Sequence, residues 1–335
     1  MGDARRIILG DYALLYRQDG VALPRIEPES RDGPREATKT IPQMTIAEWE
    51  AAFPTDDACK LYLAEHRWPE FVVCPRCGNP EVKPHAQSFN WVCYACGTGN
   101  DGYRFSVLVH TIFENTNKPL RQWFRVIHLM LTSGISALQI HRMMGFGSYR
   151  TAWYMCHRIR SGMANEDFRK LMGIVEVDET FVGGLAKNKH IDKRGKGGGT
   201  GGTGSGKIPV VGAVERKGKV VARVINSVSG DVLKTFVRGA VSEKVSLLCT
   251  DQWVGYRGLD ATYPHGVVNH AAGQYVVGAI HTQTIEGFWS IFKRGVVGTF
   301  HKVSAKYLPL YVAEFQFRYN NRGNEDIFGE AIRGS

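Results

Sequence analysis

The spacing of apolar residues predicts a helical start to the folded part of the chain. Residues 45–65 place Trp49, Phe53, Leu61 and Leu63 at intervals of a helix, so these side chains are expected to be buried. Residues 1–43 mix Arg, Asp, Glu and Pro without a sustained period, which is typical of a disordered arm.

A second group of helical patterns lies in residues 118–165. Pro119 opens a helix over residues 120–131 with one apolar face, formed by Trp123, Phe124, Ile127 and Leu131. Shorter patterns predict helices over residues 136–144 and 149–163, separated by a turn that contains Gly145 and Gly147. Three helices with a glycine turn before the last are typical of a helix-turn-helix DNA-binding region.

The third of these helices carries basic side chains that suit contacts with DNA. Tyr149 and Arg150 lie at its N-terminal end, and His157, Arg158 and Arg160 follow. We expect Tyr149, Arg150 and Arg158 to bind DNA. Ordinary helix packing remains the alternative for this segment, because helical hairpins are common scaffolds.

From residue 173 onward the pattern changes to short β-type runs. They occupy residues 173–178, 208–214, 219–226, 245–251 and 267–268, with helical patterns over 231–240 and 284–296. We interpret the order as three strands, helix, strand, helix, strand, helix, which is the order of an RNase-H-like fold. The predicted fold class is therefore α/β, an RNase-H-like mixed sheet with flanking helices.

The expected domain organisation has five parts. An arm (1–43) precedes a helix plus ribbon (44–117), a helix-turn-helix region (118–165), an RNase-H-like domain (166–323) and a tail (324–335). Within the fourth part, residues 186–207 form a Gly- and Lys-rich stretch that predicts a flexible insert. It ends in a Walker-like string that precedes a strand instead of opening a helix, which argues against an ATPase.

Two short cysteine pairs supply the most specific local motif. Cys74 and Cys77 form one CxxC pair, and Cys93 and Cys96 form another. Two such knuckles complete a closed tetrahedral thiolate site, so we predict a zinc ribbon with a structural Zn²⁺. Gly78 and Gly97 follow the pairs, where positive φ is commonly needed. Two disulfides or four unrelated cysteines are the alternatives.

Charge and hydropathy point to the class of partner. The net charge is +10 and the pI is about 9.2, which favours a polyanion such as double-stranded DNA, with simple solubility as the alternative. No apolar run is long enough to span a membrane, and no signal-peptide pattern begins the sequence. We therefore expect a soluble, nucleoid-associated protein of the cytoplasm.

Three carboxylates stand at the ends of predicted elements. Asp178 closes the first strand, Asp251 closes a later strand, and Glu286 lies in the first turn of the last helix. Hard oxygen ligands of this kind suit Mg²⁺ or Mn²⁺ in a two-metal phosphoryl-transfer site. Lys293 lies two turns after Glu286 on the same helix and is a candidate phosphate contact, with a solvated surface charge as the alternative.

Taken together, these motifs resemble those of bacterial insertion-sequence transposases that place a zinc ribbon before an RNase-H-like DDE domain. The resemblance covers about residues 45–323 and rests on the following stretches: Cys74-Pro-Arg-Cys77, Phe105-Ser106 with Thr111-Ile112-Phe113, Pro119 to Phe124, Val177 to Gly184, His281 to Trp289, Lys293-Arg294-Gly295 and Phe315 to Arg322. Gln283, in place of Asn, and His110, in place of Gly, depart from the family pattern.

The resemblance implies a catalytic triad and a reaction. Asp178, Asp251 and Glu286 would be the triad, and the reaction would be cleavage at transposon ends followed by strand transfer. Lys293 and Arg294 are expected to contact DNA, and the protein is expected to act as a homo-oligomer on transposon ends and target DNA. Two alternatives stay open: a non-catalytic DNA-binding regulator derived from a transposase, and an RNase-H-like nuclease without strand transfer.

Overall fold

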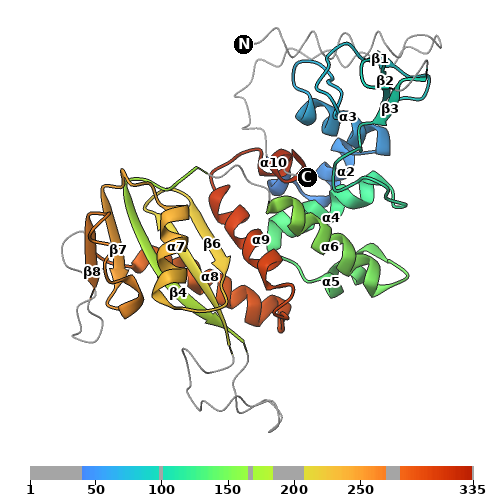
Figure 1. Ribbon diagram of the computed structural model, residues 1–335. Helices are drawn as coiled ribbons and strands as arrows, with labels where there is room; N and C mark the ends of the chain where they lie inside the picture. Colours follow the sequence, from blue (N-terminus) through green and yellow to red (C-terminus); the bar gives the residue numbers. More distant parts are fainter. Residues whose placement is uncertain (1–39, 98–100, 165–168, 184–206, 269–279, 334–335) are drawn as a thin grey trace, which may run out of the picture. The chain divides into compact units, whose positions relative to one another are not determined.

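The computed structural model describes residues 40–97, 101–164, 169–183, 207–268 and 280–333 (Figure 1). They form two compact units. Unit 1 takes the described parts of Met1–Ser133, Ile140–Gly162 and Glu325–Ser335, and unit 2 takes those of Gly134–Gln139 and Met163–Asn324. The expected arm lies outside the described residues except for its end, where Ile41–Gln43 form a 3-10 helix. The expected flexible insert also lies outside them, except for Lys207.

Unit 1 begins with two helices where one helical stretch was predicted. These are α2 (Ile46–Ala52) and α3 (Asp56–Arg67). The break follows from local chemistry, because Pro54 lacks an amide hydrogen and the Thr55 hydroxyl accepts from the Ala58 amide at 3.2 Å as a new N-cap.

Of the four side chains expected to be buried in this stretch, Trp49, Phe53 and Leu63 are fully buried. Leu61 is partly exposed.

The ribbon is a small antiparallel sheet in the order β1-β2-β3. Its strands are β1 (Lys83–Pro84), β2 (Asn90–Cys93) and β3 (Tyr103–Ser106). Aromatic rings form the core that such a short sheet otherwise lacks: Trp91 stacks on Phe105 and meets Trp68 edge-on, with centroid separations of 5.9 and 5.2 Å.

The predicted trio of helices is present with nearly the expected bounds. The helices are α4 (Leu120–Ser133), α5 (Ala137–Met144) and α6 (Tyr149–Met163). The apolar face predicted for the first helix is buried throughout, from Trp123 to Leu131.

The final residues of the chain were expected to be a tail, but they contain a packed helix. In α10 (Ile327–Arg333) the ring of Phe328 lies 5.4 Å from Phe124 and 5.9 Å from Phe53, centroid to centroid. Asp326, just before the helix, accepts from Tyr62 Oη at 3.0 Å and lies 3.0 Å from His66 Nε2. The segment is short, yet it is folded because it completes the core of unit 1.

Unit 2 is built on a five-stranded mixed sheet in the order β6-β5-β4-β7-β8. The strands are β4 (Ile174–Val182), β5 (Ile208–Glu215), β6 (Val220–Val224), β7 (Leu247–Asp251) and β8 (His265–Val268). Strands β4, β5 and β6 pair antiparallel, whereas β7 and β8 continue parallel to β4. The predicted α/β class with a mixed sheet and flanking helices is confirmed.

The helices of unit 2 are α7 (Gly230–Ala240), α8 (Gln283–Arg294) and α9 (Leu308–Asn320), with a π-helical turn (Gly295–Phe300) after α8. Between β7 and β8 the chain forms a 3-10 turn (Val254–Tyr256) where the predicted order had a helix. Gly255 and Gly258 lie in this segment, and Gly258 has a φ of 85°, a left-handed conformation that interrupts a right-handed helix.

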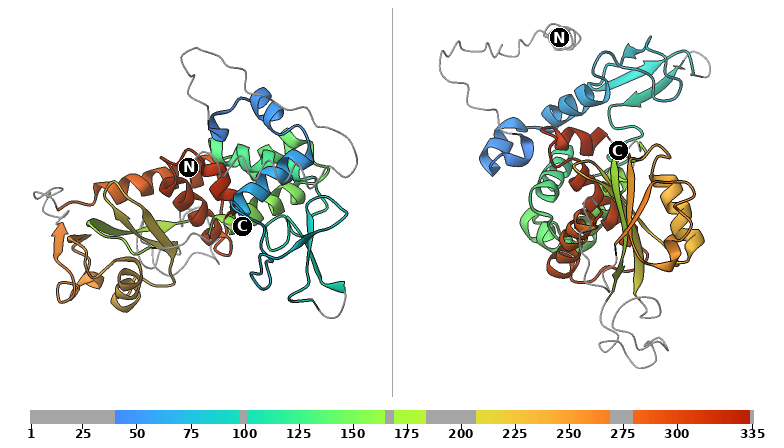
Figure 2. Two further views of the ribbon diagram at one scale, coloured as in Figure 1. Left: turned by 90° about the horizontal axis from the view of Figure 1, so that it is seen from above. Right: turned by 90° about the vertical axis from the view of Figure 1, so that its left-hand side faces the viewer.

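Each face of the sheet has its own core because side chains alternate along the strands. Val211 and Ala213 of β5 face α7, whereas their neighbours Val210 and Val214 face α8 and α9. Figure 2 shows α7 and α9 on opposite sides of the sheet. Apolar faces on both sides thus bury the sheet and leave strand ends as the places for exposed polar side chains.

In the part of the chain that the structure describes, no helix is long and apolar enough to cross a membrane.

Candidate active site and zinc centre

The two cysteine pairs meet at one point in the ribbon. All four Sγ atoms lie within 4.8 Å of one another. Cys74 and Cys96 are 3.5 Å apart, and Cys93 lies 3.7 Å from both Cys77 and Cys96. A disulfide needs sulfurs about 2.05 Å apart, so these are four free thiols and the disulfide alternative is wrong.

The sulfur separations fit a tetrahedral ion. With Zn–S bonds of about 2.3 Å, the edge of the tetrahedron is roughly 3.8 Å, close to the observed distances. The first knuckle is closed by the Gly78 amide, which donates to the Cys74 carbonyl at 2.8 Å, and Gly78 has a φ of 72° as expected. Gly97 does not have positive φ; a Cβ there would lie 2.3 Å from Gly102 Cα, so close backbone approach explains this glycine.

The three predicted acids belong to elements that adjoin in unit 2. In strand β4, Asp178 pairs with Gly212 of β5, whose missing side chain would point at Trp289 and Ile285 of α8. Asp178 therefore faces the α8 side of the sheet. Leu248 of β7 packs into the α7-side core, so Asp251, three residues later, also points to the α8 side.

Charge concentrates around Asp178. Its pKa is raised to about 7, first by burial and then by the negative charges of Glu179, Asp251 and Glu286. The negative charges of both other predicted acids thus act on the Asp178 carboxyl. The Glu286 carboxylate is exposed and accepts from the Thr282 hydroxyl at 2.8 Å, and Asp251 Oδ1 accepts from the Trp253 amide at 3.0 Å. Among the described residues, only the four cysteines form a tight cluster of ligand atoms; the three acids are more widely spaced.

The residues present fit a hard divalent cation. Carboxylate oxygens are the ligands that Mg²⁺ and Mn²⁺ prefer, and Mg²⁺ is commonly held by one or two protein carboxylates with water completing its shell. Mutual repulsion among Asp178, Asp251 and Glu286 is an electrostatic cost that a bound cation would remove.

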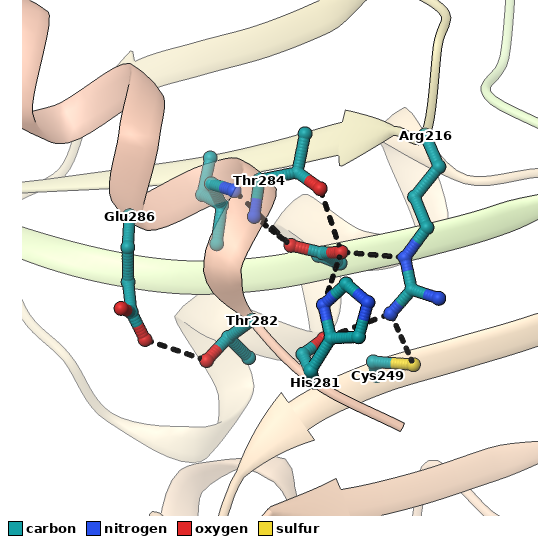
Figure 3. Close-up of polar contacts among 8 residues, drawn as sticks. Arg216, Cys249, His281, Thr282, Thr284 and Glu286 are labelled. Atoms are coloured by element: carbon teal, nitrogen blue, oxygen red, sulfur yellow. Dashed lines mark hydrogen bonds and ion pairs between the residues drawn. The ribbon is translucent and has the colours of Figure 1, made fainter. Parts of the chain in front are cut away.

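A buried glutamate beneath the acids was missed in the sequence. Glu176 of β4 is 0% exposed and accepts from Arg216 Nε at 2.6 Å. It also accepts from the Thr284 amide at 2.7 Å, the Thr284 hydroxyl at 2.9 Å and the Ile285 amide at 3.1 Å (Figure 3). The available signal was a charged residue on the inward side of an apolar strand run, where an unpaired carboxylate is very costly.

The predicted DNA-binding residues of α6 differ in exposure. Tyr149 and Arg150 are exposed at the start of the helix. Arg158 is half-buried, and its guanidinium donates to the Glu114 carbonyl at 2.6 Å. His157 and Arg160 are buried, with 7% and 1% of their surfaces exposed, so the basic face is smaller than the sequence indicated.

A groove of about 510 Å³ lies beside α6 within unit 1. Its lining includes Lys118, Trp123, Arg150, Tyr154 and Arg158. It therefore combines cationic side chains with aromatic rings. In unit 2, Lys293 and Arg294 are both exposed in the last turn of α8.

Comparison with known proteins places two domains in the chain. The family model described as a transposase zinc-ribbon domain matches residues 54–99, and the one described as an ISXO2-like transposase domain matches residues 170–320. An uncharacterized protein in the transposable element ISH50 of Halobacterium salinarum is 28% identical over 265 residues, which cover 76% of this chain and 88% of that protein. The matches confirm the resemblance to insertion-sequence transposases and are consistent with an RNase-H-like fold.

A solved chain is a weaker match. It comes from the simian T-cell lymphotropic virus intasome in complex with PP2A regulatory subunit B56 gamma, with a TM-score of 0.27 and 13% identity. The alignment covers 57% of this chain and 65% of that chain, slightly less than two thirds. We draw no conclusion about fold or function from a likeness at this level.

Proposed function

We propose that this chain, which carries a transposase zinc ribbon followed by a transposase domain, binds insertion-sequence ends and catalyses metal-dependent DNA cleavage and strand transfer. The observation that carries the proposal is the placement of three carboxylates on one side of the sheet: Asp178 and Asp251 point to the α8 side, and Glu286 lies in the first turn of α8. The pKa of Asp178 is raised by burial and by Glu179, Asp251 and Glu286, which come from the same strand, a neighbouring strand and a helix. Perturbed carboxylates gathered from separate elements are typical of catalytic sites.

Asp178, Asp251 and Glu286 are the residues that would hold Mg²⁺ or Mn²⁺. Bound metal ions in such sites activate the attacking oxygen and stabilise the leaving oxygen of a phosphodiester. The protein itself supplies the alignment. The Thr282 hydroxyl holds the Glu286 carboxylate at 2.8 Å, and the Trp253 amide holds that of Asp251 at 3.0 Å.

Each unit has surface residues suited to DNA. We assign phosphate contacts to Lys293 and Arg294 on α8, and end recognition to Tyr149 and Arg150 on α6, with Arg158 shaping the groove beside them. We expect a homo-oligomer to assemble on the DNA, because two ends must be cut and joined. Such a protein would act at the nucleoid in the cytoplasm.

Amide variants test the proposal. Asp178→Asn, Asp251→Asn and Glu286→Gln keep the shape of each side chain but remove its charge, so each is expected to lower cleavage and joining by several orders of magnitude. End binding, measured by mobility shift, should persist in all three. Double variants should be little worse than single ones, because residues that act as one unit are not additive.

The same assay separates the alternatives. A nuclease would cut the ends without joining their 3′-hydroxyls to target DNA, and a regulator would bind without cutting. Near-normal joining by the Glu286→Gln protein would remove Glu286 from the site.

A further inference from the structure

We infer that Glu176 and Arg216 form a positioning pair that sets the three proposed catalytic carboxylates relative to one another. The inference rests on the proposed function for the role of those carboxylates. Glu176 and Arg216 do not reach the reacting atoms themselves. They act on the backbone elements from which Asp178, Asp251 and Glu286 project. Figure 3 shows the contacts that Arg216, His281 and Thr284 make around the buried carboxylate.

Glu176 acts as the N-cap of α8 from a distant strand. The residue in the cap position, Thr282, makes no capping bond, because its hydroxyl donates to Glu286 instead. The amides of Thr284 and Ile285, in the first turn, donate to the Glu176 carboxylate at 2.7 and 3.1 Å. A carboxylate here also suits the positive end of the helix dipole. The start of α8 is thereby fixed to β4.

Arg216 connects Glu176 to β7, the third element that carries one of the acids. Its guanidinium donates to Glu176 at 2.6 Å and to the His281 carbonyl at 3.1 Å, and it contacts Cys249 Sγ at 4.0 Å. His281 Nδ1 lies 3.1 Å from Glu176 Oε1, the same oxygen that Arg216 Nε contacts. One planar side chain therefore touches β4, β7 and the segment that leads into α8.

The contacts form a layer directly below the proposed catalytic layer. Glu176 and Cys249 face each other as the last paired residues of β4 and β7, and each stands two positions before an acid, Asp178 or Asp251. Residues two apart in a strand share a face, so a shift of Glu176 and Cys249 also moves Asp178 and Asp251.

A buried ion pair is costly to form, and its best-attested benefit is a unique arrangement of the elements that it joins. The further contacts of the pair here, to two amides, a hydroxyl, a carbonyl, a thiol and an imidazole, serve that arrangement.

The experiment compares Glu176→Gln with Glu314→Gln. Glu314 of α9 is also 0% exposed in unit 2, so the control makes the same chemical change at equal burial, on a helix that carries none of the three acids. Arg216→Lys is the third variant; it keeps the positive charge beside Glu176 but lacks the planar guanidinium that reaches three elements. Three readouts are taken: amide hydrogen exchange at Thr284 and Ile285, Mn²⁺ binding followed by electron paramagnetic resonance, and DNA cleavage.

In Glu176→Gln and Arg216→Lys, exchange at Thr284 and Ile285 should accelerate, and Mn²⁺ affinity and cleavage should each fall about 10–100-fold. Raising Mn²⁺ should partly restore cleavage. Glu314→Gln should change none of the three, even where it lowers the melting temperature. Arg216→Lys preserves a test if Glu176→Gln fails to fold.

The inference is overturned if the Arg216→Lys protein matches the wild type in amide exchange rates, in Mn²⁺ affinity and in cleavage. That result would leave the proposed function intact. If the wild-type protein shows neither a Mn²⁺ site that depends on Asp178 nor cleavage, the proposed function fails, and the inference fails with it. Faster exchange in that case would identify only a structural cap.

Discussion

Gly212 allows α8 to lie directly against the sheet beside Asp178, and replacing it by Ala should displace that helix. Residue 212 pairs with Asp178 across β4 and β5. A Cβ at this position would lie 2.7 Å from Trp289 Cζ2, 2.9 Å from Trp289 Cη2 and 3.1 Å from Ile285 Cδ1. These atoms are the rigid ring and the packed side chain that anchor α8, so neither can turn aside freely.

The size of the displacement follows from ordinary carbon contacts. Carbon atoms pack at about 3.5–4.0 Å, so the Trp289 ring must retreat by roughly 1 Å. Overpacking of this kind costs about 1–3 kcal/mol of folding stability. A shift of about 1 Å in catalytic geometry costs on the order of a hundredfold in rate. Gly212→Ala should therefore stay folded but cleave DNA about a hundredfold more slowly.

Two further variants isolate the contact. In Gly287→Ala, on the exposed side of the same helix, the new methyl group meets nothing within 4 Å, so stability should be unchanged or rise by up to about 1 kcal/mol. Trp289→Phe removes the outer ring that the methyl group added at position 212 would strike. Denaturant unfolding of the wild type, Gly212→Ala, Trp289→Phe and the double variant should show that the double variant is more stable than the two single losses predict.

The reasoning is refuted by a Gly212→Ala protein with wild-type cleavage and unfolding midpoint. It is also refuted if Trp289→Phe and Gly212→Ala destabilise additively, because the ring would then not be the obstacle.

Three further predictions concern other parts of the molecule. The purified chain should contain one zinc per molecule by metal analysis, and replacing Cys93 and Cys96 by Ser should remove it; full retention would contradict the ribbon site. DNA affinity should fall steeply with salt, and Arg150→Ala should reduce the slope of log affinity against log salt, whereas removing the exposed Arg238 of α7 should not. The docking of α10 should depend on pH. Burial alone would lower the pKa of His66, but the hydrogen bonds of His66 to Asp326 and to the Tyr62 carbonyl raise this pKa overall. Burial alone would raise the pKa of Asp326, but His66 lowers this pKa overall. The raised pKa of His66 gives stability that is lost as pH rises above about 6.5, and the lowered pKa of Asp326 gives stability that is lost as pH falls below about 4. Unit 1 should therefore unfold at the highest denaturant concentration between these two pH values. His66→Gln should weaken the loss of stability above about pH 6.5.

Features carried by local spacing could be predicted from the sequence. Helices α4 and α6 follow from apolar residues at helical intervals and from Pro119 and the glycine turn. The zinc site follows from two CxxC pairs, because each knuckle is set by four consecutive residues. The direction of Asp178 and Asp251 toward the α8 side follows from alternation along their strands. Strand β7 ends at Asp251 as predicted, but the prediction that Asp178 closes its strand was wrong, because pairing with β5 carries β4 on to Val182.

Features that depend on distant partners could not be predicted in this way. The helix α10 is too short to be stable alone, and its order depends on Phe53, Phe124 and His66, which lie far away in the sequence. The positions of Glu176 and Gly212 gave weaker signals. A glutamate in an apolar run and a glycine within a strand both indicate a close tertiary contact, but neither indicates which element makes it.

His110 shows how a departure from a family pattern acquires a physical meaning. The transposases that the chain resembles commonly have glycine there, and in this structure His110 has a φ of 57°, the left-handed region that favours glycine. Its amide donates to Glu114 Oε2 at 3.0 Å, a local bond that helps to hold the turn. The substitution thus strains one turn of unit 1, whereas the proposed catalytic acids belong to unit 2. His110→Gly should accordingly raise the unfolding midpoint of unit 1 and leave DNA cleavage per folded molecule unchanged; a change in cleavage would give this turn a role beyond stability.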